Sequence, residues 1–172
     1  MNKYIVLFRG INVGGKNLLP MKQLVPLLEK DGFEDVSFYI QSGNVVLKSI
    51  QAPAEAIRTI VLNNFGFSPE IFILDEAQFS NASSNNPYQS FEGKFVHFYF
   101  CHSPIKLNQE KMDKYITGSE EYFINDKVFY LHAPEGIGRS KLVANIERCL
   151  GQASTGRNLN TINKISAMLL KF

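Results

Sequence analysis

The sequence predicts an α+β fold in which one arrangement of strands and helices occurs twice. The order strand, helix, strand, strand, helix, strand runs from residue 4 to residue 74 and begins again at residue 94. A long polar, turn-rich stretch, SNASSNNPYQS, separates the two runs. Residue identity between them is weak, so the repeat is one of topology. These observations predict duplicated ferredoxin-like (βαββαβ) subdomains with antiparallel sheets and an extra C-terminal helix.

The composition is that of a globular protein. Hydrophobic residues make up 45% of the 172 residues and charged residues 20%, which is enough apolar material for a sizeable core. The net charge of +2 does not demand nucleic acid, although it permits an anionic partner. We expect a first subdomain over residues 1–75, a linker over 76–93, and a second subdomain with the C-terminal helix over 94–172.

The first subdomain begins with a short apolar strand over residues 4–9. A helix follows Pro20, which suits a first helical turn. Pro26 interrupts its apolar spacing, so this helix either kinks there or starts near Val25. The remaining predicted elements are strands over 36–41 and 45–48 joined by QSGN, where Gly43 and Asn44 tolerate positive φ, a helix from Pro53 to Gly66, and a strand over 70–74.

The second subdomain repeats this order. Its elements are a strand over 94–101, a helix capped by Asn108, strands over 122–124 and 128–131 joined by NDK, a helix from GIGRS to Gly151, a brief strand within QASTGRN, and a last helix bearing Ile162, Ile165 and Leu169. The alternating strand FVHFYF fits base stacking by an RNA-binding sheet, but burial on both faces is the interpretation that we favour.

Two glycine-rich segments should meet in space. In a βαββαβ unit the end of the first strand lies beside the turn between the second and third, so FRGINVGGKN and QSGN share one end of the sheet with the start of the first helix. Glycine lets backbone amides approach an anion closely. The candidate ligand-binding residues there are Arg9, Gly10, Asn12, Gly14, Gly15, Lys16, Asn17, Gln41, Ser42 and Asn44.

The second subdomain offers further candidates. In EGIGRSKL two glycines precede a helix start that Ser140 caps, while TGRN stands before the last helix. The candidate ligand-binding residues of these two segments are Arg139, Ser140, Lys141, Arg157 and Asn158. A loop that simply starts a helix is the alternative. Tight turns also use glycine and asparagine without any ligand, and the spacing matches neither G-x-x-x-x-G-K-[ST] nor G-x-G-x-x-G.

Catalytic and metal-binding patterns are weak. His97 and His132 should lie on neighbouring strands, but no cysteine or carboxylate completes a metal site at a recognised spacing, so we expect no metal. No cofactor motif and no G-x-S-x-G segment is present. Cys101 and Cys149 lie in apolar stretches, as in a reducing compartment. The N-terminal apolar run is too short for a signal peptide and no stretch reaches membrane-spanning length, so we predict a cytoplasmic protein with no membrane partner.

Four segments carry a family resemblance: LFRGINVGGKNLLPM, YIQSGNVVL, GIGRSKL and GRNLNT. Together they resemble the bacterial proteins grouped as domain of unknown function 1697 (DUF1697). The resemblance spans the first strand to the last helix and implies two packed ferredoxin-like subdomains, but no established activity. Family members usually carry an ARNW-like segment near the end. Here Leu159 replaces the aromatic residue, which leaves no stacking role for it in this chain.

We therefore expect binding of an anionic ligand, either a phosphate-bearing small molecule or nucleic acid, through glycine-rich basic loops. One alternative is a small enzyme acting on a phosphorylated or carboxylated metabolite, in which the same loops stabilise developing charge. The sequence offers no convincing base or nucleophile for it. The other alternative is an interaction protein whose glycine turns are architectural.

Overall fold

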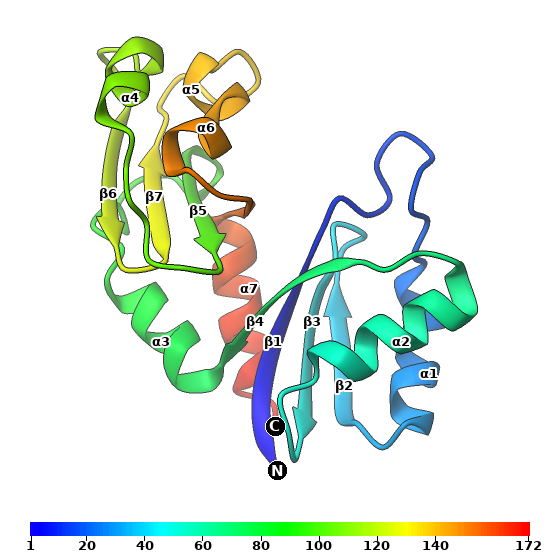
Figure 1. Cartoon of the computed structure of the whole chain (residues 1–172). Helices are drawn as coiled ribbons and strands as arrows, with labels where there is room; N and C mark the ends of the chain where they lie inside the picture. Colours follow the sequence, from blue (N-terminus) through cyan, green and yellow to red (C-terminus); the bar gives the residue numbers. More distant parts are fainter. The chain divides into compact units, whose positions relative to one another are not determined.

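The computed structural model describes residues 1–172 and contains two four-stranded antiparallel sheets (Figure 1). Sheet 1 has the order β2-β3-β1-β4 and sheet 2 the order β6-β7-β5-β8, so each half has the βαββαβ topology that the sequence predicts. The α+β prediction with a C-terminal helix is confirmed. The strands are β1 (Asn2–Arg9), β2 (Glu34–Tyr39), β3 (Asn44–Ser49), β4 (Glu70–Asp75), β5 (Val96–Cys101), β6 (Glu121–Asn125), β7 (Val128–His132) and β8 (Ser154–Asn158).

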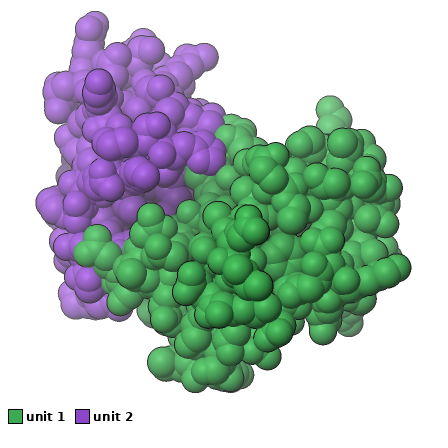
Figure 2. Space-filling view, turned by 60° about the horizontal axis from the view of Figure 1, so that its bottom comes forward, with its two compact units in different colours: residues 1–81, 163–172 green, residues 82–162 purple.

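The chain divides into two compact units, drawn in separate colours in Figure 2. Unit 1 comprises Met1–Asn81 and Asn163–Phe172, and unit 2 comprises Ala82–Ile162. The last ten residues therefore group with sheet 1, although they follow sheet 2 along the chain. None of the helices combines the length and the apolar character that a membrane-spanning segment needs.

Two helices of unit 1, α1 (Met21–Lys30) and α2 (Ala54–Phe65), cover one face of sheet 1 (Figure 1). Their apolar stripes bury a core with the inward side chains of the sheet, and this burial is the main favourable term in folding. Helix α1 begins at Met21 and continues through Pro26, so a start near Val25 is wrong. The members of this core include Val6, Phe8, Leu24, Leu28, Val45, Leu47, Ile57 and Val61.

Unit 2 has its own core on one face of sheet 2, under α4 (Gln109–Tyr115), α5 (Lys141–Ala144) and α6 (Ile146–Leu150). A single helix predicted after GIGRS is wrong, because Asn145 divides it with φ −119° and ψ 18°. The Asn145 Nδ2 donates to the Lys141 carbonyl at 2.8 Å, a side-chain bond that competes with the backbone hydrogen bonds of a helix. A short 3-10 helix, η1 (Gly93–Phe95), precedes β5.

The segment 76–93, which we expected to be a linker, begins with helix α3 (Glu76–Ser84). The Asp75 Oδ1 accepts from the Gln78 N–H at 2.7 Å, and the Gln78 Oε1 accepts from the Asp75 N–H at 2.9 Å. This reciprocal pair is a capping box, with an aspartate in the cap position, and it starts the helix in a polar sequence. The last helix, α7 (Leu159–Leu169), begins at β8.

Candidate functional site

The segment 10–17, which we call the glycine loop, leaves β1 and folds back as a small hairpin. The Asn12 N–H donates to the Asn17 carbonyl at 3.1 Å, and the Lys16 N–H donates to the Val13 carbonyl at 3.0 Å. Between them, Gly14 and Gly15 have φ of 58° and 73°, as a two-residue hairpin turn of this kind requires. No atom lies within 4 Å of a Cβ built on either glycine, so their role is conformational and they make no close packing contact.

The turn 40–43 between β2 and β3 lies beside the end of β1. The Phe8 N–H donates to the Gly43 carbonyl at 3.0 Å. Gly43 has φ 91°, and a Cβ on it would lie 2.7 Å from Ile11 Cδ1 and 2.8 Å from Phe8 Cβ. The antiparallel register, in which Leu7 faces Asn44, brings these segments together as the topology predicts. We call the glycine loop and the 40–43 turn together the rim of unit 1; Figure 1 shows the loop at the end of β1.

The side chain of Asn12 fastens the two parts of the rim to each other. Its Nδ2 donates to the Gln41 carbonyl at 2.8 Å and to the Leu19 carbonyl at 2.9 Å. Its Oδ1 accepts from the Leu19 N–H at 2.7 Å. An amide can make all of these bonds at once, because it carries two N–H donors and one carbonyl. Asn12 is therefore a structural residue of the rim, which is a role that its sequence neighbours do not reveal.

Replacing Asn12 with glycine is expected to lower the free energy of unfolding by about 1 to 2 kcal/mol, because these hydrogen bonds are lost while glycine keeps φ 54° accessible. Asn17→Gly is the matched control. Asn17 has φ 50°, and its side chain donates one exposed bond to the Gly10 carbonyl at 3.2 Å, so we expect a loss of about 0.5 kcal/mol. Urea unfolding monitored by circular dichroism measures both. Equal losses would contradict the fastening role of Asn12.

Several other candidate side chains, in the rim or directly beside it, are also engaged within unit 1. Arg9 pairs with the Glu70 carboxylate at 2.7 Å, so its charge is already partnered within unit 1. The Gln41 Oε1 accepts from the Met21 N–H at 3.4 Å. Asn44 is fully buried, and its Nδ2 donates to the Tyr39 carbonyl at 2.9 Å and to Ser42 Oγ at 3.3 Å. Neutral polar side chains therefore build the rim, and its exposed tip retains the groups available to a ligand.

That tip consists of Gly14, Gly15 and Lys16, all of which are exposed. Neither the Gly14 nor the Gly15 N–H donates a hydrogen bond within the protein. Lys16 forms no ion pair. Residues 9–28 contain three basic side chains, Arg9, Lys16 and Lys22, and no acidic one. Two free amides and an unpaired ammonium group next to them can receive an anion.

The rim also concentrates unusual backbone conformations. Five non-glycine residues and eight glycines of the chain have positive φ, and seven of these thirteen lie in the rim. One of them is Ile40, with φ 50°, a conformation that is strained for a β-branched residue. The sequence predicts positive φ at Asn44, but Asn44 is a strand residue and Ile40 takes that conformation instead. Such strain persists where the surrounding structure enforces it, and it is frequent at ligand sites.

The candidates of the second subdomain lie in unit 2 and have structural contacts there. The Ser140 Oγ accepts from the Val143 N–H at 3.2 Å and donates to Glu120, so it caps α5. The Asn158 Oδ1 caps α7 through the Thr161 N–H at 2.9 Å. These contacts match the helix-start alternative. Arg139 and Lys141 are exposed beside the cap.

Arg157 differs from the other basic candidates because it is only 8% exposed. Its Nη1 donates to Thr155 Oγ1 at 2.7 Å and to the Gly156 carbonyl at 2.9 Å. Burial lowers the pKa of its guanidinium to about 10. A buried guanidinium that holds its own strand is a structural group, so we do not include it in the surface that we propose below.

The histidines do not form a pair. In the register of β5 and β7, His132 faces Val96 while His97 faces Leu131, so the two side chains project from opposite faces of sheet 2. His132 stacks on Phe91 with ring centroids 3.9 Å apart. The Nε2 of His97 is buried without a hydrogen-bond partner, and burial lowers the pKa of this imidazole. No group of three or more His, Cys, Asp or Glu residues is arranged to hold a metal ion.

Strand β5 is buried along its whole length, as the sequence interpretation favours, so its aromatic side chains are not exposed for base stacking.

One further feature of this strand, a pocket beside it, could not be inferred from the sequence. Tyr99 lines a pocket of about 420 Å³ in unit 2. Only the packing of α5 and α6 against the sheet creates that space, because the lining residues come from three separate parts of the chain.

Two comparisons with known proteins, one by sequence family and one by structure, found similar proteins. The model of a protein family described as "Protein of unknown function (DUF1697)" matches residues 1–130. A solved structure, that of the conserved bacterial protein SP0830 from Streptococcus pneumoniae, is similar with a TM-score of 0.71, 25% sequence identity and 98% of each chain covered. No curated protein matches the chain. Since the family model covers most of the chain, including all of sheet 1, the protein belongs to the DUF1697 family.

Proposed function

We propose that unit 1 binds a phosphate-bearing ligand at the tip of its rim. One observation carries the proposal: the N–H groups of Gly14 and Gly15 are exposed, donate no hydrogen bond within the protein, and stand next to the unpaired Lys16. Adjacent amides at a turn form an anion-binding concavity, and a lysine ammonium supplies the full positive charge. A phosphate oxygen is an acceptor that suits both kinds of donor.

The charge distribution of the rim supports an anion. Lys16 and Lys22 are exposed and lie in a stretch, residues 9–28, without any acidic side chain. The other part of the rim lies in residues 36–47, which carry no charged side chain at all. Helix α1 begins at Met21 with its positive dipole end and no acidic residue in the first turn. Lys16, Lys22 and the start of α1 all contribute positive charge, so their attractions for an anion add.

The test is a nuclear magnetic resonance titration of ¹⁵N-labelled protein with inorganic phosphate. We expect the Gly14 and Gly15 amide signals to shift in a saturable way. Lys16→Ala should weaken binding by about 1 kcal/mol, roughly fivefold, as expected for one exposed charge contact, and Lys22→Ala by less. Lys30→Ala is the matched control. It also removes one lysine charge, but from the last turn of α1, whereas Lys22 lies in the first turn of that helix. It should leave the affinity unchanged.

The ligand class can be narrowed with a single-stranded oligonucleotide as a second probe. If its phosphates occupy the tip, the logarithm of the binding constant should fall linearly with the logarithm of salt concentration, and Lys16→Ala should reduce the slope by about 0.7. Phosphate that leaves the Gly14 and Gly15 signals unmoved would overturn the anion proposal. Concentration-dependent sedimentation together with unmoved signals would favour instead the interaction-protein alternative, through the exposed Val13, Leu18 and Ile40.

A further inference from the structure

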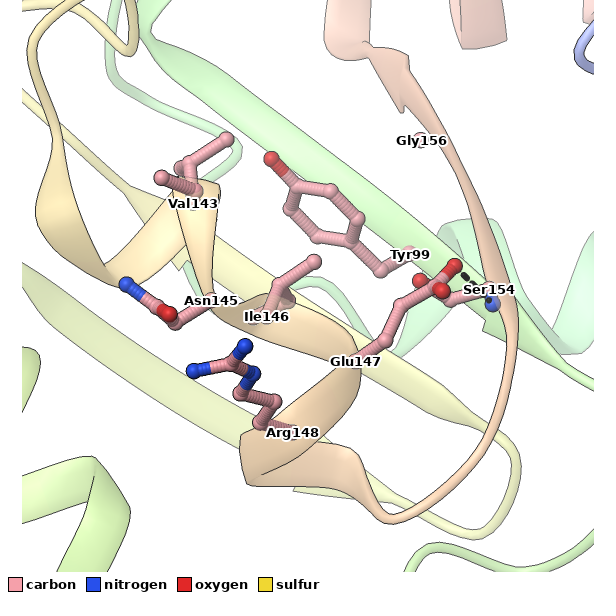
Figure 3. Close-up of a pocket in the computed structure, with 9 residues that line it drawn as sticks. Tyr99, Val143, Asn145, Ile146, Glu147, Arg148, Ser154 and Gly156 are labelled. Carbon is pink, nitrogen blue, oxygen red and sulfur yellow. Dashed lines mark hydrogen bonds between the residues drawn. The ribbon is translucent and has the colours of Figure 1, made fainter.

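A second candidate site lies in unit 2 and does not depend on the rim. Its walls come from β5, from β8 and from the junction of α5 and α6, and they border an open pocket of about 420 Å³ (Figure 3). Sites for small molecules typically measure roughly 300 to 1,000 Å³ and combine apolar walls with a few polar groups. The break at Asn145 opens the space, because the two short helices on either side of it do not run on as one.

Tyr99 supplies a polar group to this pocket. The residue is 6% exposed, and its hydroxyl makes no hydrogen bond within the protein. In the sheet register Tyr99 faces Gly156, and a Cβ on that glycine would lie 2.8 Å from Tyr99 Cε1. Gly156 thus makes room for the ring, whose hydroxyl reaches toward Val143 across the space (Figure 3). The one fully buried side-chain polar atom without a partner is His97 Nε2, so the Tyr99 hydroxyl still reaches solvent through the pocket and is free to donate to a ligand there.

Burial raises the pKa of Tyr99, and the Glu120 carboxylate adds to the shift. The hydroxyl therefore remains protonated at neutral pH and can donate a hydrogen bond to a ligand.

The Glu120 carboxylate near Tyr99 already accepts from the Thr117 N–H and the Ser140 hydroxyl, which leaves Arg148 as the charged group that favours a negatively charged ligand. Arg148 is exposed, forms no ion pair, and lines the pocket one helical turn after Asn145. The only acidic residue that lines it, Glu147, already accepts from the Ser154 N–H at 3.0 Å, which is the dashed line in Figure 3. The groups that remain for a ligand are thus a hydroxyl donor and a guanidinium.

The other walls are apolar. Val143, Ala144 and Ile146 line the side of the pocket that belongs to the two helices. A ligand that fits must present an anionic acceptor to Tyr99 and Arg148 and an apolar part to these side chains. A planar carboxylate suits a guanidinium, since two parallel N–H donors match its two oxygens.

We propose that the pocket lined by Tyr99 and Arg148 is a binding site for a small carboxylate that carries an apolar group. The Tyr99 hydroxyl and the Arg148 guanidinium donate to the carboxylate, and the apolar group packs against Val143 and Ile146. The site lies wholly within unit 2, so its occupation is separate from that of the rim.

Butyrate is a suitable probe, with butylamine as the cationic molecule of the same chain length. We expect butyrate to shift the Ala144 and Gly156 amide signals of ¹⁵N-labelled protein in a saturable way, with a Kd on the order of 1 mM for so small a ligand. Tyr99→Phe keeps the ring and removes only the hydroxyl, and it should weaken binding about tenfold. Arg148→Gln should weaken it by a similar factor.

Lys127→Gln is the charge-matched control, because Lys127 is an exposed residue of unit 2 that does not line the pocket. It should bind butyrate as the unaltered protein does. Arg148 is also exposed, so Arg148→Gln tests the proposal even if Tyr99→Phe fails to fold. The proposal is overturned if butyrate moves neither amide, if both variants bind it with unchanged affinity, or if butylamine or inorganic phosphate binds at these amides as well as butyrate does.

Discussion

Replacing Gly43 with alanine is expected to lower the free energy of unfolding by about 3 kcal/mol. Two independent effects contribute to this loss. An alanine held at φ 91° costs about 1 to 2 kcal/mol, because its Cβ crowds the following carbonyl oxygen. The new methyl group would also lie 2.7 Å from Ile11 Cδ1 and 2.8 Å from Phe8 Cβ, and overpacking of this kind costs typically 1 to 3 kcal/mol. Both neighbours are buried, so neither can move into solvent.

Gly14→Ala separates these two effects, since Gly14 also has positive φ, 58°, but no atom lies within 4 Å of its Cβ position. We expect it to lose only the conformational part, about 1 kcal/mol. Urea unfolding at neutral pH measures both variants. The same loss in the two variants would show that the close approach of Gly43 to β1 contributes nothing to stability.

Alkaline pH is expected to unfold unit 2 before unit 1. Burial, with a smaller contribution from the Glu147 carboxylate, raises the pKa of Cys101 to about 11, and burial raises the pKa of Tyr130 to about 12. The pKa of Tyr88 is raised to about 12, mainly by burial and then by Glu121, and burial also raises the pKa of Cys149. All of these residues lie in unit 2.

The sign of the effect follows from proton linkage. In each of these groups the unfolded chain loses its proton at a lower pH than the folded chain does. The folded state therefore binds more protons, and stability falls as the pH rises from about 9 toward 12. Cys101, Tyr88 and Tyr130 each contribute on the order of 1 kcal/mol to the loss near their own transitions, once their partial contact with solvent is taken into account, and Cys149 acts in the same direction. Arg157 has the opposite effect. Its pKa is lowered to about 10 in the folded state, so above pH 10 the unfolded chain binds more protons and this residue makes stability rise with pH.

Methyl signals in ¹³C-labelled protein can follow the two units separately between pH 8 and pH 11. Leu131 and Leu142 report on the core of unit 2, and Leu24 and Leu47 report on that of unit 1. The signals of unit 2 should lose their native positions at the lower pH. Cys101→Ala serves as the control, since it should flatten the dependence of stability on pH between 9 and 11. Loss of the unit 1 signals first would rule out this assignment of the alkaline transition.

The strand order and the meeting of the two rim segments could be predicted because both depend on local patterns. Alternating apolar residues and turn signals define the strands, and the βαββαβ topology then places the end of β1 beside the turn before Asn44. Helix α3 could also have been predicted, because Asp75 and Gln78 stand at the spacing of a capping box. The break at Asn145 could not have been predicted in this way, because the apolar spacing on both sides of it is helical. Only the structure shows the Asn145 side-chain bond to Lys141 that competes with the helix.

Some features of the candidate sites could be predicted from the sequence and others could not. Sequence alone determined that glycines and basic residues crowd one end of sheet 1, because residue type and order along the chain suffice for that statement. Only the tertiary structure decided that Asn12 fastens the rim, that Arg157 is buried, and that the Tyr99 hydroxyl faces a pocket. The physical reason is that hydrogen-bond partners, burial and empty space are set by segments distant in sequence, whose contacts no local pattern records.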